Sequence, residues 1–224
     1  MKFEDLTKAE PDTIFGCDVS SYQGKNTPAI WEKAEELGLS FCYCKVTEGK
    51  TIQDSQFNNN YLTLKDAYVP AGGYHFFRGG HDGKEQAENF LGQIASIYDT
   101  QDLPPVIDVE ALYDGVSVDV QIDYILQWCE TVEKELLTHP MVYTSLRVIR
   151  DLFKNTTRLS HLPLWTVDYR PKITEPRIPS GFTDWKVWQF SDKLNCPGFR
   201  QTIDVNRFFG SIDDLSTFIT ESHF

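Results

Sequence analysis

The chain has 224 residues and a formal net charge of −12, and aromatic side chains make up 13% of it. This length can bury a sizeable core and suits one large α/β domain or two small ones. Because a strongly negative protein repels phosphate groups, we expect it to bind neither nucleic acids nor anionic membrane surfaces. The N-terminal residues lack the apolar core of a signal peptide, and no stretch approaches the length of a membrane span.

The cysteines predict neither a disulfide framework nor a metal centre. Their number is odd, their spacing does not match that of zinc sites, and the acidic residues do not cluster with histidine or cysteine. We therefore expect mostly free, buried thiols, no metal and no cofactor. The cysteines are Cys17, Cys42, Cys44, Cys129 and Cys196.

Residues 1–12 are polar, and we interpret them as a lead-in, open to disorder, before a single catalytic domain at 13–224. In the first part of that domain, apolar runs alternate with stretches in which apolar residues recur at helical spacing. The predicted strands there are 14–19, 41–46, 74–77, 103–110 and 141–144. The predicted helices begin at Thr27-Pro28, Asp54, Asp82, Asp119 and Ser145.

The last third of the chain has a different rhythm. Three more strands are predicted at 162–167, 185–190 and 201–205, but prolines and glycines occupy the segments between them. Five strand–helix units followed by three strands with few helices predict an α/β fold, an irregular TIM-like barrel. An open doubly wound sheet is the competing architecture. That fold usually has a glycine-rich phosphate loop after its first strand, and residues 18–24 do not form one.

The stretch L-P-P-V-I-D-V-E at 103–110 passes from a buried strand to a pair of acids. Asp108 and Glu110 stand two residues apart, so on a strand their side chains leave the same face. Burial and like charge raise the pKa of one carboxyl, which then donates a proton while its neighbour stays ionised. Glycoside hydrolysis needs such a pair. The alternative is a strand end that carries two solvated acids.

In a barrel of this type, the functional groups gather at the carboxyl ends of the strands. Read from the sequence, these ends carry mostly acids and aromatic residues, and many like charges around one cavity are costly unless function requires them. Taken singly, each residue also has a structural explanation, such as capping a loop. The strand-end residues are Asp18, Lys45, Glu48, His75, Asp108, Glu110, Tyr143, 165–168, Gln189 and Asp204.

An ordered set of short motifs spans the chain from about Phe15 to Phe209. They are D-V-S-S-Y-Q-G (18–24), K-V-T-E-G (45–49), G-Y-H-F (73–76), Q-A-E-N-F-L (86–91), I-D-V-E (107–110), V-Y-T (142–144), P-L-W (163–165), V-W-Q-F (187–190) and I-D-V-N-R-F (203–208). In this order they resemble the family 25 glycoside hydrolases, which are lysozymes (N-acetylmuramidases). Cys17 and Phe190 depart from the family pattern, but neither touches the acids.

The resemblance implies an irregular barrel with its active site in a groove at the strand ends. It places the general acid at Glu110 and its partner at Asp108, with Asp18 and Asp204 completing the catalytic set. Candidate substrate-binding residues follow from the same alignment of motifs, although packing in the core explains several aromatic rings equally well. They are Tyr74, Phe76, Tyr143, Trp165, Trp188 and Glu48.

The expected reaction is hydrolysis of the β-1,4 bond between N-acetylmuramic acid and N-acetylglucosamine in peptidoglycan, outside the cytoplasm at the bacterial cell wall. Substrate assistance by the 2-acetamido group, steadied by Asp108 or Asp204, fits a D-x-E pair better than a carboxylate nucleophile. We expect a monomer. A chitinase-like glycosidase is a rival, but Leu103 and Val106 stand where its D-x-x-D-x-D-x-E motif has acids. The other rivals are a non-catalytic glycan-binding barrel and a metal-dependent hydrolase.

Overall fold

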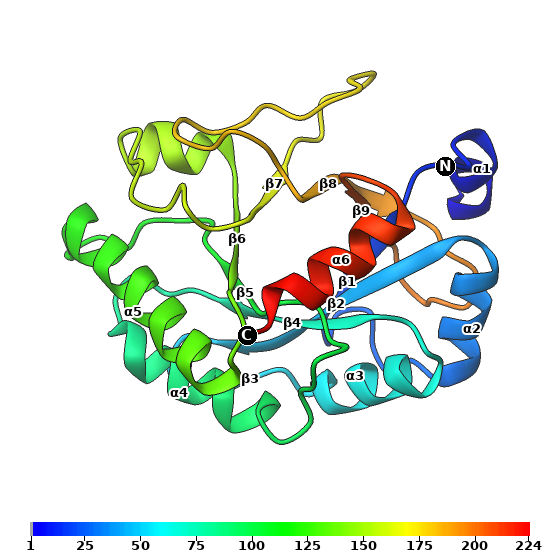
Figure 1. Cartoon of the computed structure of the whole chain (residues 1–224), viewed down its shortest axis with the longest axis horizontal. Coiled ribbons are helices and arrows are strands. Elements are labelled where there is room, and N and C mark those ends of the chain that lie inside the picture. The colour runs from blue at the N-terminus through cyan, green and yellow to red at the C-terminus, as the bar shows by residue number, and fades with distance from the viewer. Residues whose placement is uncertain (1) are drawn as a thin grey trace.

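A closed barrel forms the centre of the molecule in the computed structural model, which describes residues 2–224 (Figure 1). Parallel neighbours run from β1 to β8, and β9 closes the barrel because it pairs antiparallel with both β8 and β1. A short strand, β3, pairs only with β2. The strands are β1 (Phe15–Val19), β2 (Leu39–Glu48), β3 (Ile52–Gln53), β4 (Ala71–Phe76), β5 (Val106–Asp108), β6 (Met141–Thr144), β7 (Leu164–Val167), β8 (Val187–Leu194) and β9 (Ile203–Phe208).

Helices cover the outside of the first part of the barrel, and extended loops replace them in the last third (Figure 1). The helices are α2 (Pro28–Glu36), α3 (Phe57–Asp66), α4 (Gly83–Ile94) and α5 (Val118–Leu136). After β6 the expected fifth helix is reduced to a short π-helix, Val148–Leu152. The predicted irregular TIM-like barrel is therefore confirmed. Across residues 2–224, no helix is both long and apolar enough to cross a membrane.

The N-terminal segment is not the disordered lead-in that its polar composition indicates. Residues Phe3–Ala9 form helix α1, and its Phe3 and Leu6 side chains are buried. Phe3 packs edge-on against Phe15 of β1, with ring centroids 6.1 Å apart. Two apolar residues three positions apart are enough to attach this helix to the barrel wall.

A C-terminal helix, α6 (Ile212–Ser222), was not predicted from the sequence. It starts at a capping box in which Ser211 and Asp214 satisfy each other's backbone N–H groups. Its Leu215 and Ile219 join the buried side chains inside the barrel, near Phe208. The helix thereby closes the end of the barrel at which the parallel strands begin, and leaves the opposite end free for a site.

Large aromatic side chains fill the barrel interior, and glycine makes room for them. A Cβ atom on Gly72 of β4 would lie 2.3 Å from the ring of Tyr43, and one on Gly16 of β1 would lie 2.3 Å from the ring of Phe41. Both contacts are far shorter than packed atoms tolerate. These glycines therefore provide space for neighbouring rings.

We expect Gly72→Ala to lower the free energy of unfolding by about 1–3 kcal/mol, because the new methyl group overpacks the barrel core. Gly92→Ala is the matched control, since nothing lies within 4 Å of its Cβ position on helix α4. There the better helix propensity of alanine should raise stability by about 0.5–1 kcal/mol. Urea unfolding of both variants measures the two effects. A Gly72→Ala variant with the free energy of unfolding of the wild type would contradict the packing argument.

Candidate active site

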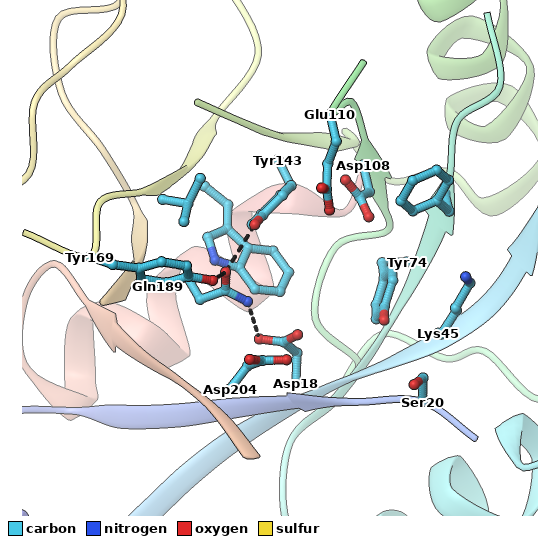
Figure 2. Close-up of a pocket in the computed structure, with 13 residues that line it drawn as sticks. Asp18, Ser20, Lys45, Tyr74, Asp108, Glu110, Tyr143, Tyr169, Gln189 and Asp204 are labelled. Carbon is cyan, nitrogen blue, oxygen red and sulfur yellow. Dashed lines mark hydrogen bonds between the residues drawn. The ribbon is translucent and has the colours of Figure 1, made fainter. Parts of the chain in front are cut away.

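A pocket of about 440 Å³ opens at the carboxyl ends of the parallel strands. Four carboxyl groups from β1, β9 and the end of β5 line it: Asp18, Asp204, Asp108 and Glu110. Figure 2 shows Asp18 beside Asp204 and, across the pocket, Asp108 beside Glu110. The other lining residues are Ser20, Lys45, Tyr74, Phe76, Tyr143, Trp165, Val167, Tyr169 and Gln189.

Strand pairing brings Asp18 and Asp204 together from opposite ends of the chain. The two residues stand directly opposite each other in the antiparallel register of β1 and β9. Like charges in that position repel each other. Burial raises the pKa of Asp18 to about 6 and that of Asp204 to about 8, and for Asp204 the nearby charge of Asp18 adds to the effect. At neutral pH the two carboxyls therefore hold about one proton between them.

A network of hydrogen bonds fixes the orientation of Asp18. The Gln189 Nε2 and Asn206 Nδ2 atoms both donate to Asp18 Oδ2, at 2.9 and 2.8 Å. The Tyr143 hydroxyl donates to Gln189 Oε1 at 2.9 Å, and the Tyr169 hydroxyl donates to the same atom. Because its oxygen accepts from two hydroxyls, the Gln189 amide must turn its nitrogen toward Asp18. Oδ2 of Asp18 is then the acceptor of both amide hydrogen bonds.

The second pair combines a buried acid with an accessible one. Asp108, the last residue of β5, is buried, and its Oδ1 atom has no hydrogen-bond partner in the described residues. Burial first, and then the charges of Glu110 and Asp18, raise its pKa well above the usual range. Glu110 is exposed at the mouth of the pocket, yet the protein atoms around its carboxyl raise its pKa by desolvation. Glu110 is thus placed to deliver a proton to a bound molecule.

Comparison with known proteins identifies the family. A model of the glycosyl hydrolases family 25 matches residues 17–199, a range that includes Asp18, Asp108 and Glu110. The chain belongs to glycosyl hydrolase family 25. It is 28% identical over 211 residues to lysozyme M1 from Streptomyces globisporus, covering 91% of this chain and 70% of that protein. It is also 28% identical to the N,O-diacetylmuramidase from Arthroderma benhamiae, covering 94% and 90% of the two chains.

The fold agrees with those of a solved lysozyme and a solved family 25 glycosyl hydrolase. The crystal structure of a bacterial lysozyme from Streptomyces coelicolor superimposes with a TM-score of 0.85 at 27% identity, covering 93% of this chain and 98% of the other. The structure of a family 25 glycosyl hydrolase from Bacillus anthracis has a TM-score of 0.80 at 25% identity, covering 93% and 94%. The protein is therefore a glycoside hydrolase.

Four of the six predicted substrate-binding residues line the pocket of this family 25 enzyme, namely Tyr74, Phe76, Tyr143 and Trp165. The interpretation of Trp188 as a groove residue was wrong. Its neighbour Gln189 points into the barrel, so Trp188 on the same strand points out, where its Nε1 donates to the Asp168 carbonyl oxygen at 3.0 Å.

Glu48 and His75 also lie outside the pocket lining. Glu48 binds Lys45 at 2.6 Å and also pairs with Arg78, so its carboxylate is occupied at the rim. His75 is fully buried, with Thr47 and Gln86 as hydrogen-bond partners at 2.7 and 3.1 Å. Burial lowers the pKa of His75 to about 4, so it is a neutral core residue.

Sequence reasoning missed Ser20, Tyr169 and Asn206. Asn206 accepts a hydrogen bond from Trp165 Nε1 at 2.9 Å and donates to Asp18, which joins the barrel interior to the site. Its position two residues after Asp204 on β9 was the available signal, since i and i+2 share one face of a strand. Tyr169 lies in the loop after β7, and hydrophobic periodicity does not predict where a side chain in a loop points.

The acids should make stability depend on pH. Because the folded-state pKa of Asp204, about 8, exceeds its ordinary value of 3.8, folding takes up a proton between these limits. The contribution of Asp204 to stability is then most favourable at low pH and becomes less favourable as the pH rises toward 8. We expect Asp204→Asn to raise the free energy of unfolding by about 1–2 kcal/mol at pH 8 and by little at pH 4. Thermal unfolding at both pH values tests this, and an equal effect at the two values would contradict it.

Proposed function

We propose that this glycoside hydrolase is a muramidase that hydrolyses the β-1,4 bond between N-acetylmuramic acid and N-acetylglucosamine in bacterial peptidoglycan. The single observation that carries the proposal is the convergence of Asp18, Asp108, Glu110 and Asp204 in one open pocket. The names of the relatives, a lysozyme and an N,O-diacetylmuramidase, support the substrate class. The place of action is the bacterial cell wall, and a monomer is sufficient because one chain supplies all four acids.

In the first step Glu110 acts as the general acid. Its carboxyl transfers a proton to the glycosidic oxygen as the bond from that oxygen to the anomeric carbon breaks. The sugar's own acetamido oxygen attacks the anomeric carbon, which gives a cyclic oxazolinium ion. Asp108 accepts a hydrogen bond from the acetamido N–H, for which its Oδ1 atom is available because no group among residues 2–224 bonds to it. Asp108 reacts as the carboxylate, and its negative charge stabilises the positive ring.

In the second step the ionised Glu110 removes a proton from water, and the water oxygen attacks the anomeric carbon. The ring of the oxazolinium opens, and the acetamido group and Glu110 return to their starting states. Asp18 and Asp204, which share a proton, hold sugar hydroxyls from the opposite side of the pocket. The aromatic rings of Tyr74, Phe76 and Trp165 provide apolar surface for the faces of the sugars.

The products of digestion test this function. Mass spectrometry of digested, reduced peptidoglycan should show new reducing ends on muramic acid. Reducing ends on glucosamine would make the enzyme a glucosaminidase, and a purified, folded protein that yields no fragments would be a binding protein.

A further inference from the structure

A second cleft of about 470 Å³ lies on the outer wall of the barrel, beside the active-site pocket. We call it the side cleft. It is bounded by helix α1, the start of the loop after β7, and strands β8 and β9. Tyr169 lines both the side cleft and the active-site pocket, so the two are neighbours across one side chain. The cleft exists because no helix follows β7 to cover this wall (Figure 1).

The charge of the side cleft is opposite to that of the protein. The whole chain has 33 acidic and 21 basic residues. The side cleft has one acid, Glu10, and four cations: Arg170, Lys172, Lys193 and Arg207. An acidic protein with a local excess of positive charge attracts anions to that place.

Two of these cations are held by short ion pairs, and the other two are exposed and available to a ligand. Arg170 is held by Asp168 and Arg207 by Glu10, at 2.8 Å in each case. Lys193 is exposed, and its nearest acid is the neighbouring Asp192 at 3.8 Å. Lys172 is also exposed and forms no ion pair within residues 2–224.

Aromatic rings form part of the wall between the cations. The guanidinium group of Arg207 lies over the rings of Trp188 and Phe190, 5.2 and 4.6 Å from their centroids. The buried Nε of Arg207 has no hydrogen-bond partner among the described residues. A ligand that matches this surface carries carboxylates and short apolar groups.

We propose that the side cleft binds the peptide stem of peptidoglycan, with Lys172 and Lys193 contacting its carboxylates. This inference rests on the proposed function. The stem is attached through the lactyl group of muramic acid, so it leaves a glycan bound in the pocket at its side. Its alanine methyl groups match the apolar part of the cleft wall, and its free carboxylates are complementary to the cations. A glycan in the pocket thus directs its stem past Tyr169 toward the cations.

The test compares substrates with and without peptide, using Lys172→Glu, Lys193→Glu and the double variant. Substrates are sacculi freed of phosphate polymers with hydrofluoric acid, and glycan strands stripped of peptide by an amidase. We expect kcat/KM on the sacculi to fall about 2- to 3-fold in each single variant and about 5- to 10-fold in the double variant, mainly through KM. Rates on stripped strands should not change. Lys134→Glu, an exposed lysine near the end of α5, is the charge-matched control.

Other results would overturn the side-cleft assignment. No loss on sacculi, or the same loss on both substrates, excludes a peptide contact. A loss seen only with walls that keep their phosphate polymers assigns the cleft to phosphate. Binding of the tetrapeptide L-Ala-γ-D-Glu-L-Lys-D-Ala is followed in parallel by NMR. It tests the cleft even if the wild-type enzyme cuts neither substrate, a result that would reject the proposed function instead. The assignment is also overturned if the wild-type protein does not bind the tetrapeptide, or if the double variant binds it as tightly as the wild type.

Discussion

Replacement of Glu110 by glutamine is expected to lower the rate of cell-wall lysis about 10³-fold while the protein stays folded. Glutamine has nearly the same shape but no proton to give to the leaving oxygen. The residue is exposed at the mouth of the pocket and forms no ion pair within the described part of the chain, so the exchange removes no ion pair. Turbidity of a cell-wall suspension measures the rate, and circular dichroism measures the fold.

Glu135→Gln is a suitable control for this experiment, because Glu135 is an exposed residue near the end of α5, away from the pocket lining. It should lyse walls at the wild-type rate. If Glu110→Gln kept more than about a tenth of the wild-type rate, Glu110 would have no role as general acid, and Asp204, with its pKa raised to about 8, would be the next candidate.

Asp108→Asn is expected to have the second largest effect, with opposite signs for activity and stability. Activity should fall about 10²- to 10³-fold, because an amide cannot supply the negative charge that stabilises the oxazolinium ion. The melting temperature at pH 7–8 should rise, because the buried carboxyl, whose pKa is raised, is costly to ionise there. Asparagine has the same shape and removes that cost.

This variant separates two roles for Asp108. A residue that worked only as a neutral hydrogen-bond donor would be replaced well by asparagine, so near-normal activity would remove the substrate-assisted mechanism. Asp12→Asn, an exchange at an exposed residue, is the control for the change of charge alone. It should leave both the rate and the melting temperature unchanged.

Local patterns in the sequence were sufficient for one half of the acid cluster. Asp108 and Glu110 share the pocket because residues two apart on an extended chain point the same way, although β5 itself ends at Asp108. The chain remains extended past that point, since the Val109 N–H donates to the Tyr143 carbonyl oxygen at 2.9 Å. The alternation of strands and helices likewise predicted the barrel, because hydrophobic periodicity reports which face of each element is buried.

Sequence motifs placed Asp18 and Asp204 in the same site, but their direct pairing needed the tertiary structure. Asp18 and Asp204 are neighbours only because β9 runs antiparallel into the gap beside β1, and no local pattern specifies a pairing between strands so far apart. The error at Trp188 has a related cause. In V-W-Q-F, Trp188 and Phe190 share the more apolar face, but the face with Val187 and Gln189 points into the barrel, and composition does not show this. Local sequence determined the barrel strands, the first helices and the Asp108–Glu110 pair. Closure of the barrel determined which side chains meet, because long-range packing selects the partners and the inward face of each strand.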